Sequence, residues 1–240
     1  GTYEEQLVPG NSGTEGNYVT YRAYNDEPVT LTGSFDPATI FLDGVGHVAI
    51  EGLTVADARW LEAVGAHHVI LRGNSFLRTP ASGTTGNVRF ISSHDNRILD
   101  NVITDGNDNL LLIDSDHNLV EGNTISEARH SVWGIRCGDF NVLRGNFFSN
   151  TQQKIGEVYD CGEDTTAVPH AFESTTHNLI ESNVFADASS YYSTSGGNGI
   201  QYAGQDGIIR FNVFFDANVG RGMQTYSDEA EFNERNRVYH

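Results

Sequence analysis

Lysine is almost absent from this chain, and acidic residues greatly outnumber basic ones. Lys154 is the only lysine beside 13 arginines, and the formal net charge is −18. A surface of this sign repels nucleic acid and anionic membranes, so neither is expected as a partner. An anionic polysaccharide would be repelled as well, unless calcium bridged it to the protein.

Cysteines and long apolar runs are also scarce. Two cysteines, Cys137 and Cys161, are too few to fix the redox compartment. They lie about one repeat apart, so a disulfide and a pair of stacked, buried thiols are both open, with the thiols favoured. No segment is long and apolar enough to span a bilayer, and membrane insertion is not expected.

A short motif recurs along most of the chain. One copy, HVILRGNSFLRT, begins at His68, and other copies are HNLVEGNTISEA from His117 and HNLIESNVFADA from His177. The intervals between copies vary around this fixed motif, which is typical of stacked coils joined by loops of unequal length. The seventh place of the motif holds Leu53, Asn74, Asn101, Asn123, Asn146, Asn183 and Asn212.

Each copy of the motif predicts a strand, a sharp corner and a second strand. Val, Ile and Phe dominate, and no helical period is sustained. Asparagine tolerates the left-handed backbone conformation, so we expect it at the corner, with its amides hydrogen-bonded from coil to coil. Third strands are expected at VRFISS (from Val88), LLLIDS (Leu110), VWGIRC (Val132), AFESTT (Ala171), GIQYAG (Gly199) and GMQTYS (Gly222).

Three strands per coil of about 22 residues predict an all-β fold, a right-handed parallel β-helix of about eight to nine coils. The pattern in HNLIESNVF resembles the pectate-lyase-like β-helix superfamily, from residue 49 to the end. The opening GTYEEQLVPGNSGTEGNYVTYRAYNDEPVTL resembles the first coil of relatives of alginate lyase and chondroitinase B. Residues 1–240 are expected to form a single β-helix domain that starts and ends within coils, whose open ends favour end-to-end or edge self-association.

The resemblance implies an extracellular or periplasmic protein with a substrate groove beside the third strands. Lyases of this superfamily remove the proton next to a uronate carboxylate, with lysine or arginine often as the base and calcium often neutralising the carboxylate. Lys154, Arg136 and His130 are the candidate catalytic residues, and Arg136 faces outward if Ile135 points into the core. The plainer alternatives are a solvated lysine, a ladder of paired surface charges and an ordinary surface histidine.

The candidates for substrate and metal binding surround Lys154. Arg89, Tyr159, Glu173 and His170 are the candidate sugar-binding residues, and Glu157, Asp160 and Asp114 are the candidate ligands of calcium. A second arrangement places Asp114, Asp116 and Asp139 around one calcium ion on neighbouring coils, with solvated or turn-forming aspartates as the alternative. The histidines that open copies of the motif, His47, His117 and His177, are interpreted as corner residues.

Several motifs of the family are missing. We find no Asn-Gly-x-Glu calcium segment, no lysine followed one coil later by arginine, and no Gly-His-Gly of the polygalacturonases. The sequence predicts a carbohydrate-active β-helix protein acting on polysaccharide. Its leading activity is β-elimination on a uronate polysaccharide, and the alternative is a non-catalytic carbohydrate-binding or structural module.

Overall fold

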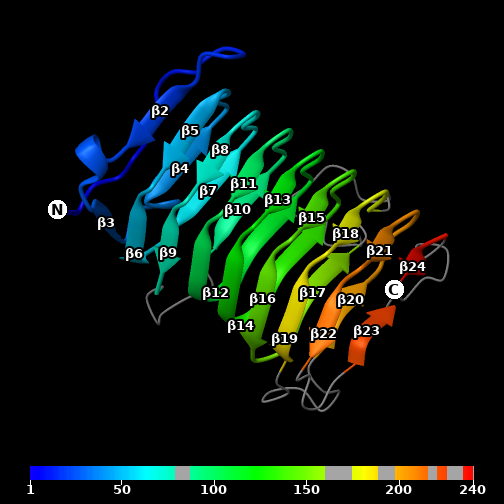
Figure 1. Cartoon of the computed structure of the whole chain (residues 1–240). Helices are drawn as coiled ribbons and strands as arrows, with labels where there is room; N and C mark the ends of the chain where they lie inside the picture. The colour runs from blue at the N-terminus through cyan, green and yellow to red at the C-terminus, as the bar shows by residue number, and fades with distance from the viewer. Residues whose placement is uncertain (79–86, 160–174, 189–197, 216–220, 226–234, 240) are drawn as a thin grey trace.

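The chain winds into a parallel β-helix whose coils are stacked from the N-terminal to the C-terminal end (Figure 1). The structure, a computed structural model, describes residues 1–78, 87–159, 175–188, 198–215, 221–225 and 235–239. Strands on neighbouring coils pair in parallel, as the sequence predicts. The one helical segment in the described part is a short 3-10 turn, η1 (Tyr24–Asp26).

One face of the stack is a sheet of nine strands, one for each coil. The strands are β2 (Val19–Arg22), β5 (Val48–Glu51), β8 (Ile70–Arg72), β11 (Arg97–Leu99), β13 (Leu119–Glu121), β15 (Val142–Arg144), β18 (Leu179–Glu181), β21 (Ile208–Arg210) and β24 (Arg237–Tyr239). From β5 to β21 each strand comes from the first half of a motif copy, and the apolar residue at the fourth place of the copy is buried in the core.

A second sheet of 15 strands covers the other two sides of each coil. Its main path is β1 (Thr2–Tyr3), β3 (Thr30–Gly33), β6 (Thr54–Ala58), β9 (Ser75–Leu77), β12 (Val102–Ile113), β14 (Thr124–Arg136), β16 (Phe147–Thr151), β19 (Val184–Ala188) and β22 (Val213–Phe215). The third side adds β4 (Ile40–Asp43), β7 (Leu61–Val64), β10 (Val88–Ile91), β17 (Lys154–Tyr159), β20 (Asn198–Tyr202) and β23 (Arg221–Thr225). The long strands β12 and β14 belong to both sides.

The third strand of one coil differs from the prediction. AFESTT was expected to fill the place between β14 and β20, and β17 fills it instead, with Gly134 opposite Glu157 and Glu157 opposite Gln201. The apolar side chains Ile155 and Val158 of KIGEVY are buried in this strand. Residues 171–174 of the predicted segment lie outside the described part of the chain.

The predicted asparagine ladder is present and buried. The Asn101 Nδ2 donates to the Oδ1 of Asn123 at 3.0 Å, and the Asn123 Nδ2 donates in turn to the Oδ1 of Asn146 at 3.0 Å. The prediction was wrong about the backbone, because it is the residue before each ladder position that has a positive φ. These corner residues are Gly52, Gly73, Asp100, Gly122, Gly145, Ser182 and Phe211.

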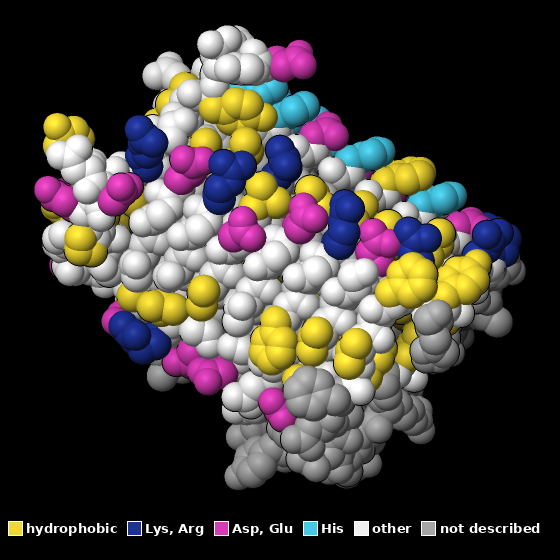
Figure 2. Space-filling model, viewed as in Figure 1, with side chains coloured by type: hydrophobic (Ala, Val, Ile, Leu, Met, Phe, Trp, Pro, Cys, Tyr) yellow, Lys and Arg dark blue, Asp and Glu magenta, His cyan; other side chains and the backbone are white. Residues whose placement is uncertain are grey.

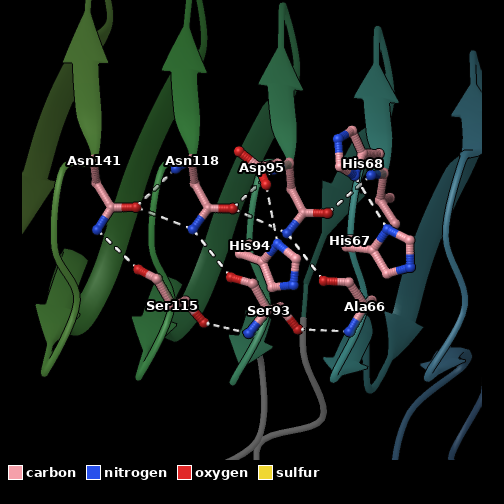
Figure 3. Close-up of polar contacts among 11 residues, drawn as sticks. Ala66, His67, His68, Ser93, His94, Asp95, Ser115, Asn118 and Asn141 are labelled. Atoms are coloured by element: carbon pink, nitrogen blue, oxygen red, sulfur yellow. Dashed lines mark hydrogen bonds and ion pairs between the residues drawn. The ribbon is translucent and has the colours of Figure 1, made fainter. Parts of the chain in front are cut away.

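A second ladder, which the sequence analysis missed, runs parallel to the first. The Asn96 Nδ2 donates to the Oδ1 of Asn118 at 2.9 Å, and the Asn118 Nδ2 donates to the Oδ1 of Asn141 at 3.0 Å (Figure 3). The hydroxyl of Ser115 accepts from the backbone N–H of Ser93 alongside it. Along these ladders, neighbouring coils are therefore held together at two corners by buried side-chain amides, in addition to the strand hydrogen bonds.

Two further points follow from the described residues. Cys137 is disulfide-bonded, so the favoured interpretation as a free thiol was wrong for this residue; Cys161 lies outside the described part. Among the described segments, there is no helix with the length and apolar character of a membrane span.

Candidate functional site

A cavity of about 220 Å³ opens on the outer surface of β10, β12, β14 and β17. Three neighbouring columns of outward-facing residues reach this surface, because parallel pairing in register places equivalent positions side by side. Its polar lining, which we call the groove, consists of Asn87, Arg89, Asp108, His130, Arg136, Glu157 and Tyr159. The groove lies beside the third strands; that it holds a substrate stays a prediction.

His130 lies between two carboxylates of the groove. Its Nδ1 is 2.7 Å from the Oδ1 of Asp108, and its Nε2 is 3.7 Å from the Oε1 of Glu157. A β-bulge produces this placement: Gly106 pairs with Ala128, but Asp108 pairs with Ser131, so β14 carries one extra residue opposite β12. Bulges re-aim side chains in this way.

The charge of His130 is governed by these neighbours. The hydrogen bond with Asp108 raises the pKa of His130 above its ordinary value, and the nearby charge of Glu157 acts in the same direction, against the effect of burial. The backbone N–H of Ser131 donates to the same Asp108 oxygen at 3.1 Å, which fixes the carboxylate. An imidazole held by a carboxylate is suited to exchange protons near neutral pH.

Lys154 is an ion-pair partner of Glu157 in this structure. Its Nζ lies 2.7 Å from the Oε1 of Glu157, whose side chain is only 5% exposed. The hydroxyl of Ser131 donates to the same carboxylate oxygen, and Lys154 also donates to the hydroxyl of Tyr159 at 2.5 Å. The Nζ of Lys154 is occupied by this ion pair and by the bond to Tyr159, so the geometry favours His130 over Lys154 as a base.

Arg136 and Tyr159 form the next part of the groove. They are direct partners on β14 and β17, and the guanidinium of Arg136 lies 5.7 Å from the centre of the Tyr159 ring. Ile135 is buried, so Arg136 faces outward as predicted. Burial and the charge of Glu157 raise the pKa of Tyr159 far above its usual value, which keeps the phenol protonated.

Arg89 also lines the groove, two coils before Arg136 on β14 and three coils before β17. Its register partners are Glu62 on β7 and Leu111 on β12, so it lies one outward column away from Arg136. The guanidinium makes two contacts to the Oε2 of Glu62, one of them an Nε–H bond of 3.0 Å. Arg89 is thus oriented by a half-buried ion pair.

The predicted calcium ligands do not converge within the described residues. Asp114 accepts from the hydroxyl of Ser92 at 2.7 Å at an exposed corner, away from Glu157. Asp116 accepts from the backbone N–H of Asp139 at 2.7 Å, as a turn-stabilising aspartate does. Three of the predicted site residues, Asp160, His170 and Glu173, lie outside the described part of the chain.

A different group of side chains meets the geometric requirement for a metal site. Potential ligand atoms of His47, His67 and His68 all lie within 4.8 Å of one another, the one such group of three or more in the described part of the chain. His47 and His68 occupy equivalent corner positions on successive coils, with φ of 53° each. The motif predicts His47 only as a corner residue, but the adjacent pair His67–His68 one copy later is a sequence signal for the group.

Comparison with known proteins identifies the family. The model of the family described as periplasmic copper-binding protein (NosD) matches residues 5–213. The chain belongs to the NosD family. This NosD-family chain had no match in a search of curated proteins.

Solved structures similar to this NosD-family chain are β-helix proteins. The Streptococcus pneumoniae surface adhesin PfbA matches with a TM-score of 0.68 and 10% identity, over 98% of this chain and 67% of that chain. An alginate lyase from Paenibacillus sp. str. FPU-7 matches with a TM-score of 0.54 and 14% identity, over 94% of this chain and 89% of that chain. A pectate lyase from Bacillus sp. N165, in complex with trigalacturonate, matches with a TM-score of 0.54 and 11% identity, over 96% of this chain and 83% of that chain. At these identities the likeness concerns the right-handed parallel β-helix fold.

The description of the NosD family names copper, and the side chains of this chain show which kind of metal ion they could hold. Copper, like zinc, accepts imidazole nitrogen as a ligand, whereas calcium prefers six to eight oxygens. His47, His67 and His68 offer three imidazoles at one corner, and their ligand atoms are close together. The residues therefore fit a copper-type ion better than they fit calcium.

Proposed function

We propose that the groove binds a uronate-containing polysaccharide and that His130 exchanges a proton with the bound sugar during β-elimination. The observation that carries this proposal is the position of His130 in the cavity, between Asp108 on one side and Glu157 on the other, with Arg136 and Tyr159 lining the same cavity. The solved structures that resemble this chain include an alginate lyase and a pectate lyase, which supports a role related to carbohydrates; the reaction is our inference.

Each group in the groove has a role in such a reaction. The hydrogen bond to Asp108 places the proton of neutral His130 on Nδ1 and leaves the lone pair of Nε2 to accept the proton next to the uronate carboxylate. The released electron pair forms the carbon–carbon double bond as the bond to the glycosidic oxygen breaks. Arg136 balances the negative charge of the uronate carboxylate, and the phenol of Tyr159 supplies a proton to the leaving oxygen.

A second candidate is a glycan-binding module without catalysis. Its support is that Arg89 and Lys154 are already bound to Glu62 and Glu157, and that the net charge is −18. Under this alternative the groove still holds a sugar through Arg136 and Tyr159. Binding without product formation is the result that distinguishes it.

The proposed setting of the protein is an exported compartment. The family is described as periplasmic, and the resemblance of the sequence to exported β-helix proteins favours the extracellular space or the periplasm. We further propose that the chain acts as one β-helix domain. Association through its edge strands remains a prediction, and sedimentation over a range of protein concentrations tests it.

A panel of glycans tests the proposal. The protein is incubated with alginate, polygalacturonate and glycosaminoglycans, with calcium or with a chelator, and the ultraviolet absorbance of unsaturated products is followed while binding is measured separately. We expect product from at least one uronate polymer, and loss of binding and turnover in Arg136→Gln. The matched control is Arg97→Gln, an exposed arginine of β11 on the nine-stranded face. Equal activity in Arg136→Gln and wild type would remove the groove from the account.

A further inference from the structure

A row of histidines runs along one corner of the β-helix, where the third side of each coil meets the nine-stranded sheet (Figure 2). Three of them, His47, His67 and His68, which we call the histidine corner, approach one another at the N-terminal part of the row. All three are half-buried, so their rings are held by the fold and still reach solvent. They lie outside the set of residues that lines the groove.

The distances within the histidine corner are those of ligands around one ion. The Nδ1 atoms of His67 and His68 are 3.1 Å apart, and all three residues have a ligand atom within 4.8 Å of the others. Nitrogens bound to one metal at about 2.0–2.1 Å lie about 2.9–3.4 Å apart, so His67 and His68 already have this spacing. The centre of the His47 ring lies 4.7 Å from that of the His68 ring, and the two ring planes are tilted by 39°.

The backbone holds these residues in place from both sides. The N–H of His47 donates to the carbonyl of His67 at 3.1 Å, and the N–H of His68 donates to the carbonyl of His94 at 3.2 Å. His94 also stacks on the ring of His67, with centroids 5.6 Å apart and planes at 10° (Figure 3). Asp95 accepts from His94 at 3.0 Å, which fixes the stacking ring in turn.

Gly46 makes the close approach of His67 possible. A Cβ built on Gly46 would lie 2.2 Å from the Cε1 of His67, well inside contact distance. The glycine therefore leaves a space that the imidazole of the next coil occupies. A side chain at this position would displace His67 from the other two histidines.

His47 supplies a second, independent observation. Its Nδ1 is buried and has no hydrogen-bond partner in the described part of the chain. An unsatisfied buried polar atom is unfavourable, and native structures contain few of them. A bound cation shared with His67 and His68 would satisfy the histidine corner as a whole.

We propose that His47, His67 and His68 bind a single transition-metal ion that prefers imidazole nitrogen, an ion of the copper and zinc type. Three protein ligands leave at least one position open for water or for a ligand from a partner. His94 and Asp95 are positioning residues that orient His67, and Gly46 provides the space for its ring. This site is separate from the groove, so the proposal does not depend on the glycan function.

Equilibrium dialysis and isothermal titration with Cu²⁺ and Zn²⁺ test the site on chelator-treated protein. We expect one ion per chain, nitrogen hyperfine structure in the electron paramagnetic resonance spectrum of bound Cu²⁺, and no comparable binding of Ca²⁺. The double substitution His67→Gln/His68→Gln should abolish this binding. His117→Gln/His177→Gln, at equivalent corner positions with φ of 55° and 54°, is the matched control and should leave it unchanged.

A second variant keeps all three ligands. Gly46→Ala should weaken binding about 10–100-fold, the usual effect of disturbing the residues that orient metal ligands, while the circular dichroism spectrum stays that of the wild type. Binding that survives in His67→Gln/His68→Gln, or that is lost equally in the control, would overturn the proposal. Product formation at the groove should be the same in all of these variants, so the two proposals fail separately.

Discussion

Replacing Asn123 by alanine should destabilise the β-helix by about 2–6 kcal/mol. The Oδ1 of Asn123 accepts from the backbone N–H of Asn101 at 2.8 Å, and its Nδ2 donates to the carbonyl of Ile98 at 2.8 Å. Both backbone groups are left without this side-chain partner in the variant, at about 1–3 kcal/mol each. The neighbouring ladder amides also lose a bond, but the Asn146 Oδ1 keeps the backbone N–H of Asn123 as a donor and the Asn101 Nδ2 keeps the carbonyl of Leu71 as an acceptor, so the range counts only the two backbone groups.

Urea denaturation followed by circular dichroism measures this cost. Thr124→Ala is the matched control, because Thr124 follows Asn123 directly and faces solvent. Substitutions at exposed positions usually change stability by no more than about 0.5 kcal/mol. If the two variants unfolded at the same urea concentration, the asparagine ladder would contribute nothing specific to the fold, and the reasoning would be refuted.

Two further predictions concern the groove and the core beneath it. The hydrogen bond to Asp108 raises the pKa of His130, so the acidic limb of the pH–activity profile should lie above the ordinary histidine value of about 6.5. Asp108→Asn removes this effect and should move the limb to lower pH. If the limb did not move, a group other than His130 would be responsible for it. Gly156→Ala should lower the melting temperature strongly, because the added Cβ would lie 2.1 Å from the Cζ2 of buried Trp133. Gly10→Ala is the control and should leave the melting temperature unchanged, because a Cβ at this exposed position would have no atom within 4 Å. Equal melting temperatures for the two glycine variants would contradict the packing argument.

The repeat predicted most of the fold because each copy carries the same physical information. Apolar fourth places such as Leu71 and Val120 are fully buried, and the ladder asparagines join the coils as expected. The conformation of the corner was misassigned because the left-handed residue is the one before the asparagine. Glycine stands there in several copies, for example Gly73 and Gly122, so the sequence does hold the signal.

The candidate sites were harder to predict because they depend on contacts between coils. His130 was a candidate, but its contact with Asp108 depends on a bulge in β14 that no residue pattern announces. The ion pair of Lys154 with Glu157 requires knowing that KIGEVY is itself a strand. By contrast, stacking equivalent positions of two motif copies was enough to bring His47 beside His68.

The rate of unsaturated product formation by His130→Gln tests the central claim most directly. Wild type, His130→Gln and the corner variant His117→Gln are compared on the glycan that binds best, at equal saturation. The account predicts that His130→Gln binds the glycan as wild type does but forms product at least about 100-fold more slowly, the usual contribution of a general base. Full activity in His130→Gln, or no product from any of the three proteins, would contradict it.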